Sequence, residues 1–297
     1  MFIAERPRDP TTMATMAATP FPRLPDTLLS KYACGQLALR PFGVSERDLE
    51  VGFTGQPRPH LITQLIAACT VGANGERLEP DFFWGLPVGK RIECLLTIAA
   101  AGDRTEFVIP LRCPDEACAQ ASELELSLSE IVSLQNQTDD AERFAVRRGD
   151  ERLYVRRPTG SDQLDWLDAR FADEPTAFGA MVRALVSTDE AGASSVSSVG
   201  AEVDGGWIGV IEEALDEFDP LVNFSLSVRC PFCEAEHEHA IDLEELSLRR
   251  LRQSQLRLLA SVHRLAKHYH WNEREIFAVP HWRRAFYLAL IDREEDR

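Results

Sequence analysis

The stretch LSVRCPFCEAEHEHAIDLEEL, Leu226 to Leu246, decides which fold this chain can adopt. Two cysteines, Cys230 and Cys233, enclose a Pro-Phe pair, and segments that alternate between apolar and polar residues flank them. Because alternation with a period of two is typical of a half-buried strand, the stretch predicts a β-hairpin whose turn carries two thiols. Two thiolates are too few for a structural zinc ion, which takes four ligands. The chain must therefore supply a second pair.

That second pair lies in VIPLRCPDEACAQASELELSLSEI, at Cys113 and Cys118. Here too the first cysteine follows an arginine and precedes a proline, with alternating apolar residues before it. Structural zinc sites commonly combine two such closely spaced pairs. We therefore predict that Cys113, Cys118, Cys230 and Cys233 bind one structural zinc ion, with each pair at the turn of a small zinc-ribbon-like hairpin.

Two other interpretations of these cysteines stay open. They could be relics of an ancestral metal site, or a redox-active pair. The acidic flank EAEHEHAIDLEE argues against redox chemistry, because carboxylates raise the pKa of a nearby thiol. Within this flank, His237 and His239 are predicted to lie on the exposed face of a strand; the alternative is that they bind the metal if one thiol does not. Cys69 and Cys94 sit in apolar runs and are predicted to be buried as small hydrophobic residues.

The spacing between the pairs predicts an internal duplication. The leading cysteines are 117 positions apart (230 − 113), and two Arg-Pro-x-Gly turns, at Arg40 and Arg157, are also 117 apart (157 − 40). An apolar helical run follows each turn at the same distance. Three features in one register predict two copies of one unit, each built of strand, turn, helices and a cysteine hairpin. The alternative is that short turn motifs recur here by chance.

These observations predict an α+β fold with internally duplicated helical units, small β-hairpins and a C-terminal helical segment. The predicted organisation is a disordered tail at 1–24, a first repeat at 25–140, a second repeat at 141–246 and a C-terminal helical docking segment at 247–297. The tail is rich in Pro, Thr and Ala and lacks the continuous apolar core of a secretory signal.

Composition narrows the possible functions. The chain has 297 residues and a formal net charge of −16, which argues against a broad phosphate-binding face and makes nucleic acid an unexpected partner. No apolar run approaches the roughly 18–20 residues that span a bilayer, so no membrane partner is expected. Without a secretory signal, a reducing cytoplasm is expected, where paired cysteines indicate metal sooner than disulfides. The common nucleotide-binding, metalloprotease and hydrolase motifs are missing, so we predict a protein that is not an enzyme.

The C-terminal segment is strongly patterned. Apolar residues from Leu248 to Tyr269 form one helical stripe, with arginines 249, 250, 252 and 257 assigned to the opposite face. Asn272 is a predicted helix N-cap with Glu275 at the capping-box position. The four histidines of this segment, at positions 263, 268, 270 and 281, are predicted to pack and hydrogen-bond without binding metal.

Aromatic and arginine side chains at the end of the chain predict a docking surface, because protein interfaces favour Trp, Tyr and Arg. The predicted partner-binding residues are Trp271, Trp282, Arg283, Arg284 and Tyr287. A nucleic-acid patch around the paired arginines is the alternative.

The segment SVHRLAKHYHWNEREIFAVPHWRRAFYLALI resembles the closing helices of baseplate proteins from contractile phage tails and related injection machines. The resemblance falls on His263, Leu265, Ala266, Tyr269, Trp271, Glu275, Ile276, Pro280, Arg283, Arg284, Tyr287 and Leu288. LPVGKRIECLLTI and RRPTGSDQLDWL are similar to the phage T4-type baseplate hub assembly family.

The resemblance implies a non-enzymatic protein that helps to assemble the baseplate hub or stays within the baseplate, with other baseplate or hub proteins as partners. It would act in the cytoplasm of a bacterial host or within the assembled phage or injection particle. The chain departs from the family in its duplication and in its first cysteine pair, which is C-x4-C where the family shows C-x2-C. A zinc- or thiol-dependent enzyme and a zinc-ribbon nucleic-acid-binding protein are the alternatives.

Overall fold

The computed structural model describes residues 18–24, 26–32, 36–72, 78–101, 106–136, 141–188 and 203–296. Its described part combines helices with small antiparallel sheets, so the predicted α+β class is confirmed. The helices are α1 (Asp26–Tyr32), the 3-10 helix η2 (Glu46–Leu49), α2 (Arg58–Cys69), α3 (Pro80–Trp84), α4 (Val88–Ala100), α5 (Leu128–Asn136), α6 (Gly160–Asp168), α7 (Glu174–Leu185), α9 (Gly205–Phe218), α10 (Leu243–Tyr269), α11 (Glu273–Ala278) and α12 (His281–Glu295). The strands are β1 (Thr19–Pro20), β2 (Leu37–Leu39), β3 (Thr70–Gly72), β4 (Glu106–Arg112), β5 (Ala121–Ser127), β6 (Arg143–Arg148), β7 (Glu151–Arg156), β8 (Val186–Ser187), β9 (Ser225–Arg229) and β10 (Glu236–Ala240).

Two three-stranded sheets have the same antiparallel order, β1-β2-β3 in the first half of the chain and β6-β7-β8 in the second. Leu39 lies opposite Thr70 in the first sheet, and Val155 lies opposite Val186 in the second. Leu39 and Val155 are 116 positions apart in the chain (155 − 39), and so are Thr70 and Val186 (186 − 70). The middle and last strands of the two sheets therefore share one register.

An arginine at the end of β2 fixes the loop that follows. Arg40 donates from both terminal nitrogens to Asp48, at 2.6 and 3.0 Å, and from Nη2 to the carbonyl of Ala68 at 2.8 Å. The fully buried Asp48 carboxylate also accepts the backbone N–H groups of residues 43–45. Because strand, loop and helix converge on one carboxylate, its charge and every donor around it are satisfied.

The second half repeats this arrangement. Arg156 donates to both oxygens of Asp162 at 2.6 Å and to the carbonyl of Ala184 at 3.3 Å. The counterpart of Arg40 is therefore Arg156, whereas the Arg-Pro-x-Gly alignment matched it to Arg157. In the first half the arginine that pairs with the aspartate also begins the Arg-Pro-x-Gly turn, whereas in the second half the turn begins one residue after it, at Arg157. Arg157 is instead buried, 3.7 Å from the carboxylate that ends α9.

The main core surrounds α4, which is buried along its whole length. Helices α2, α5 and α10 pack against it. Its charged side chains have polar partners: Lys90 Nζ lies 3.1 Å from Glu93 Oε2, and the terminal nitrogens of Arg91 donate to two backbone carbonyls and to Thr63. Burying these charges is tolerated because each has a polar partner.

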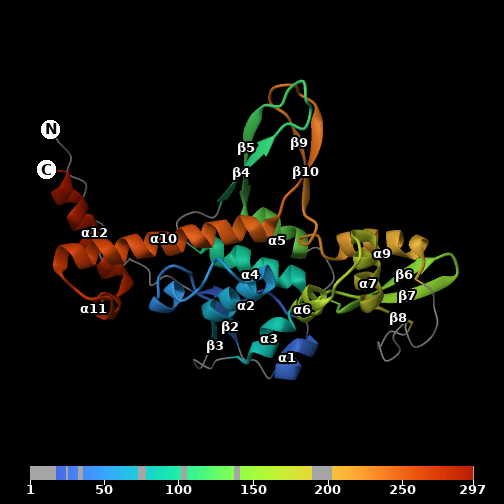
Figure 1. The fold of residues 1–297 in the computed structure, drawn as a ribbon, viewed down its shortest axis with the longest axis horizontal. Coiled ribbons are helices and arrows are strands. Elements are labelled where there is room, and N and C mark those ends of the chain that lie inside the picture. The colour runs from blue at the N-terminus through green and yellow to red at the C-terminus, as the bar shows by residue number, and fades with distance from the viewer. Residues whose placement is uncertain are drawn as a thin grey trace.

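Both cysteine hairpins rise from this core, as Figure 1 shows: β4–β5 and β9–β10 project from the same side of the helical body and lie side by side. Phe107 and Ile109 of β4 and Phe224 and Ile241 at the base of the second hairpin belong to one apolar cluster. The prediction that each cysteine pair sits at the turn of a hairpin is confirmed.

Two smaller apolar clusters stabilise the ends of the molecule. One contains Trp207 and Ile211 of α9, packed on the β6-β7-β8 sheet. The other joins Leu265 of α10 with Ile276 and Ile291 of the last two helices. The predicted helical stripe on α10 and the Asn272 capping box are confirmed. The predicted boundary between residues 246 and 247 falls inside α10, which continues across it without a break.

The predicted disordered tail was placed at residues 1–24, of which 1–17 lie outside the described residues. For residues 18–24 the prediction is wrong. Strand β1 pairs with β2, the N–H of Phe21 donates to the carbonyl of Leu37 at 3.1 Å, and Leu24 is buried in the main core. Ladder hydrogen bonds and apolar burial together order this short segment.

The Arg40–Asp48 pair yields a stability test. Replacing Asp48 by Ala leaves Arg40 and three backbone N–H groups without their acceptor, and we expect the free energy of unfolding to fall by about 3–5 kcal/mol. Asp162→Ala should cost less, because Arg156 is more exposed than Arg40 and water can solvate it. Urea denaturation measures both. Glu213→Ala, at an exposed position of α9, is the control, and its free energy of unfolding should stay within about 0.5 kcal/mol of wild type. If Asp48→Ala changed the free energy of unfolding no more than this control, the stabilising role of the Arg40–Asp48 pair would be contradicted.

Candidate metal centre

The turns of the two hairpins bring four sulfurs together. Cys113 and Cys118 come from the β4–β5 turn, Cys230 and Cys233 come from the β9–β10 turn, and their Sγ atoms all lie within 4.8 Å of one another. The Cys113 sulfur is 3.7 Å from that of Cys233, and the Cys118 sulfur is 3.8 Å from that of Cys230. These contacts cross from one hairpin to the other, and the distances are far beyond a disulfide bond of about 2.05 Å.

These distances fit a tetrahedral ion. Zn–S bonds of about 2.3 Å place the sulfurs of a regular tetrahedron about 3.8 Å apart. Among the described residues, these four cysteines are the group of side chains close enough together to bind one metal ion. The histidines of the C-terminal segment belong to no such group within the described part of the chain. The arrangement can therefore hold a metal ion between the hairpins, with all four ligands supplied by the chain.

Matching backbone hydrogen bonds shape the two turns. The N–H of Cys113 donates to the carbonyl of Gln120 at 2.9 Å, and the N–H of Cys230 donates to that of Ala235 at 2.9 Å. These bonds close each hairpin just above its cysteines. The first turn holds two more residues than the second, in keeping with C-x4-C against C-x2-C.

The arginine before each leading cysteine braces its turn. Arg112 Nε donates to the carbonyl of Ala119 at 3.2 Å, and Arg229 Nε donates to that of Glu234 at 3.1 Å. Ala119 and Glu234 each follow the second cysteine and adopt left-handed conformations, with φ of 45° and 61°. The arginine of each Arg-Cys-Pro sequence thus has a structural role, because it hydrogen-bonds across its turn. The sequence pattern alone did not predict this role.

The thiols differ in their surroundings. Cys113 and Cys230 are buried, Cys118 is half-buried and Cys233 is exposed. The backbone N–H groups of Cys233 and Phe232 lower the pKa of the Cys230 thiol to about 7, whereas burial raises the pKa of Cys113 to about 12. A metal ion that binds here must displace protons, since thiolates are the ligands.

One histidine reaches this cluster. His237 Nε2 lies 3.5 Å from the Cys113 sulfur. The prediction that His237 and His239 occupy the exposed face of their strand is wrong: both are half-buried, and the glutamates between and before them are exposed. His237 lies opposite Val228 in the register, on the face that leads to the buried Ile241. Because side chains two positions apart in a strand lie on the same face, the spacing of His237 and His239 from the apolar Ile241 could have predicted this orientation from the sequence.

The two cysteines in apolar runs are structural. Cys69 and Cys94 are fully buried, and burial raises the pKa of Cys69 to about 12. Their prediction as small hydrophobic residues is confirmed.

Two predicted partner-binding residues, Trp271 and Tyr287, lie in an aromatic cluster. The ring of Trp271 stacks on Tyr269 at 4.8 Å and meets Tyr287 edge-on at 5.3 Å. Both are half-buried against α10, so packing of the last helices accounts for much of their surface.

The other three predicted partner-binding residues differ in exposure. Trp282 is 53% exposed, and Arg283 is exposed and donates to the hydroxyl of Tyr287 at 3.2 Å. Arg284 is buried and donates to the carbonyl of Val44 at 2.7 Å. The alternation of exposure arises because neighbouring residues of a helix point in different directions. Arg284 therefore belongs to the interior of the C-terminal segment, apart from Trp282 and Arg283.

The chain matches no protein-family model, and no curated protein or solved structure is found to be similar. Among the described residues, no helix has both the length and the hydropathy needed to cross a membrane.

The left-handed turn residue gives a test of the hairpin geometry. Ala119→Gly removes the cost of holding an L-residue at positive φ, and we expect the free energy of unfolding to rise by about 0.5–1 kcal/mol. Thermal or urea denaturation with metal present measures it. Ala121→Gly, in the extended first residue of β5, should destabilise by a similar amount. A loss of stability on Ala119→Gly would contradict the turn as described.

Proposed function

We propose that this chain is a non-enzymatic assembly protein whose two hairpins are joined by a structural zinc ion. The observation that carries this proposal is the spacing of the four sulfurs, which matches a closed tetrahedral site. A zinc ion with four cysteine ligands has no open position for water or substrate, so it stabilises the fold and does not catalyse. Cys113, Cys118, Cys230 and Cys233 would hold it.

We also propose that the two halves arose by duplication and that the hairpins form one zinc ribbon divided between them. The identical 116-residue offset of the β2–β3 and β7–β8 pairings supports this. So do the two arginine–aspartate pairs and the matching arginine braces of the turns. A duplication explains why half of a zinc site lies more than a hundred residues from the other half.

Assembly of a baseplate hub, or a place within the baseplate of a contractile tail or injection particle, is the role we propose. It rests on the resemblance of the C-terminal segment. The exposed Trp282 and Phe286 of α12 support a docking role, because large exposed aromatic side chains are typical anchors of protein interfaces. Other baseplate or hub proteins would be the partners, met in the bacterial cytoplasm or in the particle.

Metal analysis tests the structural zinc. We expect one zinc per chain by mass spectrometry of the purified protein, with loss of zinc and of cooperative unfolding in Cys113→Ser and Cys230→Ser, because each change removes one of four ligands. Ser227→Ala, in the neighbouring strand, is the control and should keep full zinc. Full zinc in both cysteine variants would contradict the site. An intact metal-free fold with reactive thiols would favour the thiol-enzyme alternative.

Particle analysis tests the partners. In cells that produce a contractile tail, we expect Trp282→Ala to lower the protein recovered with purified particles or their hub intermediates by about tenfold or more, as loss of an interface anchor does. Thermal stability should be unchanged, since Trp282 is exposed.

The matched control for this test is Leu167→Ala in α6, whose side chain is 49% exposed. It should leave recovery as in wild type. Equal recovery of wild type and Trp282→Ala would contradict a docking role for α12, and absence of the wild-type protein from both particles and intermediates would contradict the baseplate assignment.

A further inference from the structure

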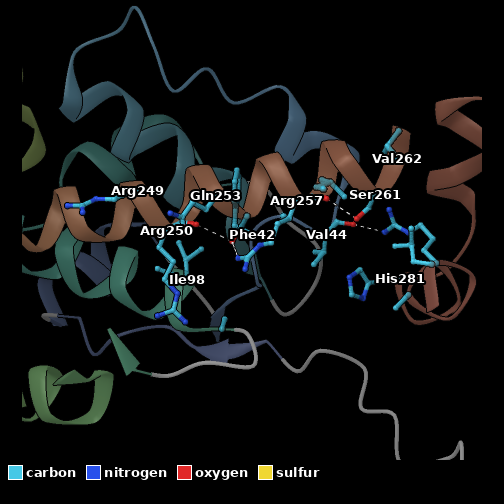
Figure 2. Close-up of a pocket in the computed structure, with 18 of the residues that line it drawn as sticks. Phe42, Val44, Ile98, Arg249, Arg250, Gln253, Arg257, Ser261, Val262 and His281 are labelled. Carbon is cyan, nitrogen blue, oxygen red and sulfur yellow. Dashed lines mark hydrogen bonds between the residues drawn. The ribbon is translucent and has the colours of Figure 1, made fainter. Parts of the chain in front are cut away.

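A groove runs along one side of α10 and ends at the start of α12. Figure 2 shows Arg250, Gln253 and Arg257 of α10 along this groove, with Phe42 and Val44 of the loop after β2 beside them. Its volume is about 730 Å3. That volume is within the range of about 300–1,000 Å3 that is typical of ligand-binding pockets.

The charge of the groove is opposite to that of the chain. Four arginines line it, at positions 249, 250, 257 and 284, against a single glutamate, Glu106. The whole chain has 48 acidic and 32 basic residues. Sequence periodicity placed four α10 arginines, at positions 249, 250, 252 and 257, on the face away from the apolar stripe, and of these four only Arg252 lies outside the groove. A local positive field on an acidic protein is a recognition feature, because it attracts anionic groups and orients them.

Arg284 is the deepest of these cations. It is 7% exposed, Nη2 donates to the carbonyl of Val44, and Nε has no hydrogen-bond partner. Burial lowers its pKa, and among the described residues no carboxylate offsets that burial. A buried arginine without a counter-charge is costly for the free protein, and an anionic ligand nearby would reduce that cost.

Apolar side chains complete the groove. Phe42 of the loop, Leu258 and Val262 of α10 and Leu288 of α12 line it together with the arginines. Gly43 keeps the loop close to the helix: its φ is +86°, and a Cβ there would approach the backbone of Ser254 within 3.0 Å. Arginines and apolar side chains thus line one groove, which suits a peptide that carries both carboxylates and apolar side chains.

We propose that this groove binds an acidic segment of a partner protein, with carboxylates on Arg249 and Arg257 at the rim and toward Arg284, and apolar side chains against Phe42 and Leu258. The inference rests on the proposed assembly function and adds the chemistry of the partner. A peptide is favoured over nucleic acid because the groove is partly apolar and the chain as a whole repels polyanions. Its charge complements an acidic segment and repels a basic one.

Binding to a defined probe tests the groove. The probe is a short fluorescein-labelled peptide of Glu, Leu and Ser, followed by fluorescence anisotropy with the full-length zinc-loaded protein. We expect saturable binding, weakened about tenfold or more by combining Arg249→Glu with Arg257→Glu. A peptide with Gln in place of Glu should bind the wild-type protein about as weakly as the Glu peptide binds the double arginine variant.

Arg252→Glu is the matched control, since Arg252 is exposed on the same helix outside the groove. It should keep wild-type binding. Arg284→Met should also weaken binding about tenfold, because the cation that lines the groove is removed. An arginine with only a structural role, through its hydrogen bond to Val44 and its contact with the Phe277 ring, would lower the midpoint of thermal unfolding and leave binding unchanged.

Several outcomes would overturn this inference. One is equal binding by wild type and the double arginine variant. Another is groove-dependent binding of oligothymidylate in preference to the acidic peptide, which would make the ligand nucleic acid. A third is concentration-dependent self-association that the double variant abolishes, which would make the occupant a second copy of this chain.

Failure here is distinguishable from failure of the proposed function. If Trp282→Ala loses particle recovery while the groove variants bind and assemble normally, the docking role stands and the groove assignment falls. If the groove binds the peptide but the protein is not recovered with particles or intermediates, the acidic partner stands and the baseplate role falls.

Discussion

The meeting of the four cysteine sulfurs is the constraint on which the rest of the structure depends. Sulfurs 3.7–3.8 Å apart on two hairpins require the hairpins to lie side by side with their turns level. Their bases must then lie in one place, and Phe107 and Phe224 do share the main core. The proposed metal ion at the turns and apolar burial at the bases would therefore act on the same arrangement from opposite ends, each lowering the free-energy cost of forming the other.

The two halves share an arginine–aspartate junction but differ in the length of the helix that follows the cysteine hairpin. In each half an arginine at a strand end joins an aspartate, a loop and the end of a helix, which secures the strand–helix junction. The helix after the first hairpin, α5, has nine residues, whereas α10 after the second has 27. That extension crosses to the first half, where Gln255 donates to the carbonyls of Asp48 and Val51. The loop held by the buried Asp48 thereby becomes one wall of the arginine-lined groove.

This arrangement separates two tasks along one chain. The cysteine cluster is closed, with every ligand provided internally, and it suits a stabilising role. The groove and the exposed end of α12 are open and carry the arginine and aromatic side chains that protein interfaces favour. Rigid hairpins beside an open surface at α10–α12 would suit the proposed assembly role, because a preorganised surface loses less entropy when it binds.

The sequence by itself determined the local features: the strands that flank Cys113 and Cys230, the stripe of α10 and the capping box at Asn272. Each depends on residues a few positions apart, whose periodicity and turn chemistry act locally. Tertiary structure decided the rest. It made Arg156, and not Arg157, the counterpart of Arg40, turned His237 toward the Cys113 sulfur, buried Arg284 and placed three arginines of α10 in a groove. Those outcomes depend on how elements distant in the chain pack together, because burial and charge environment are properties of the assembled fold and not of any one segment.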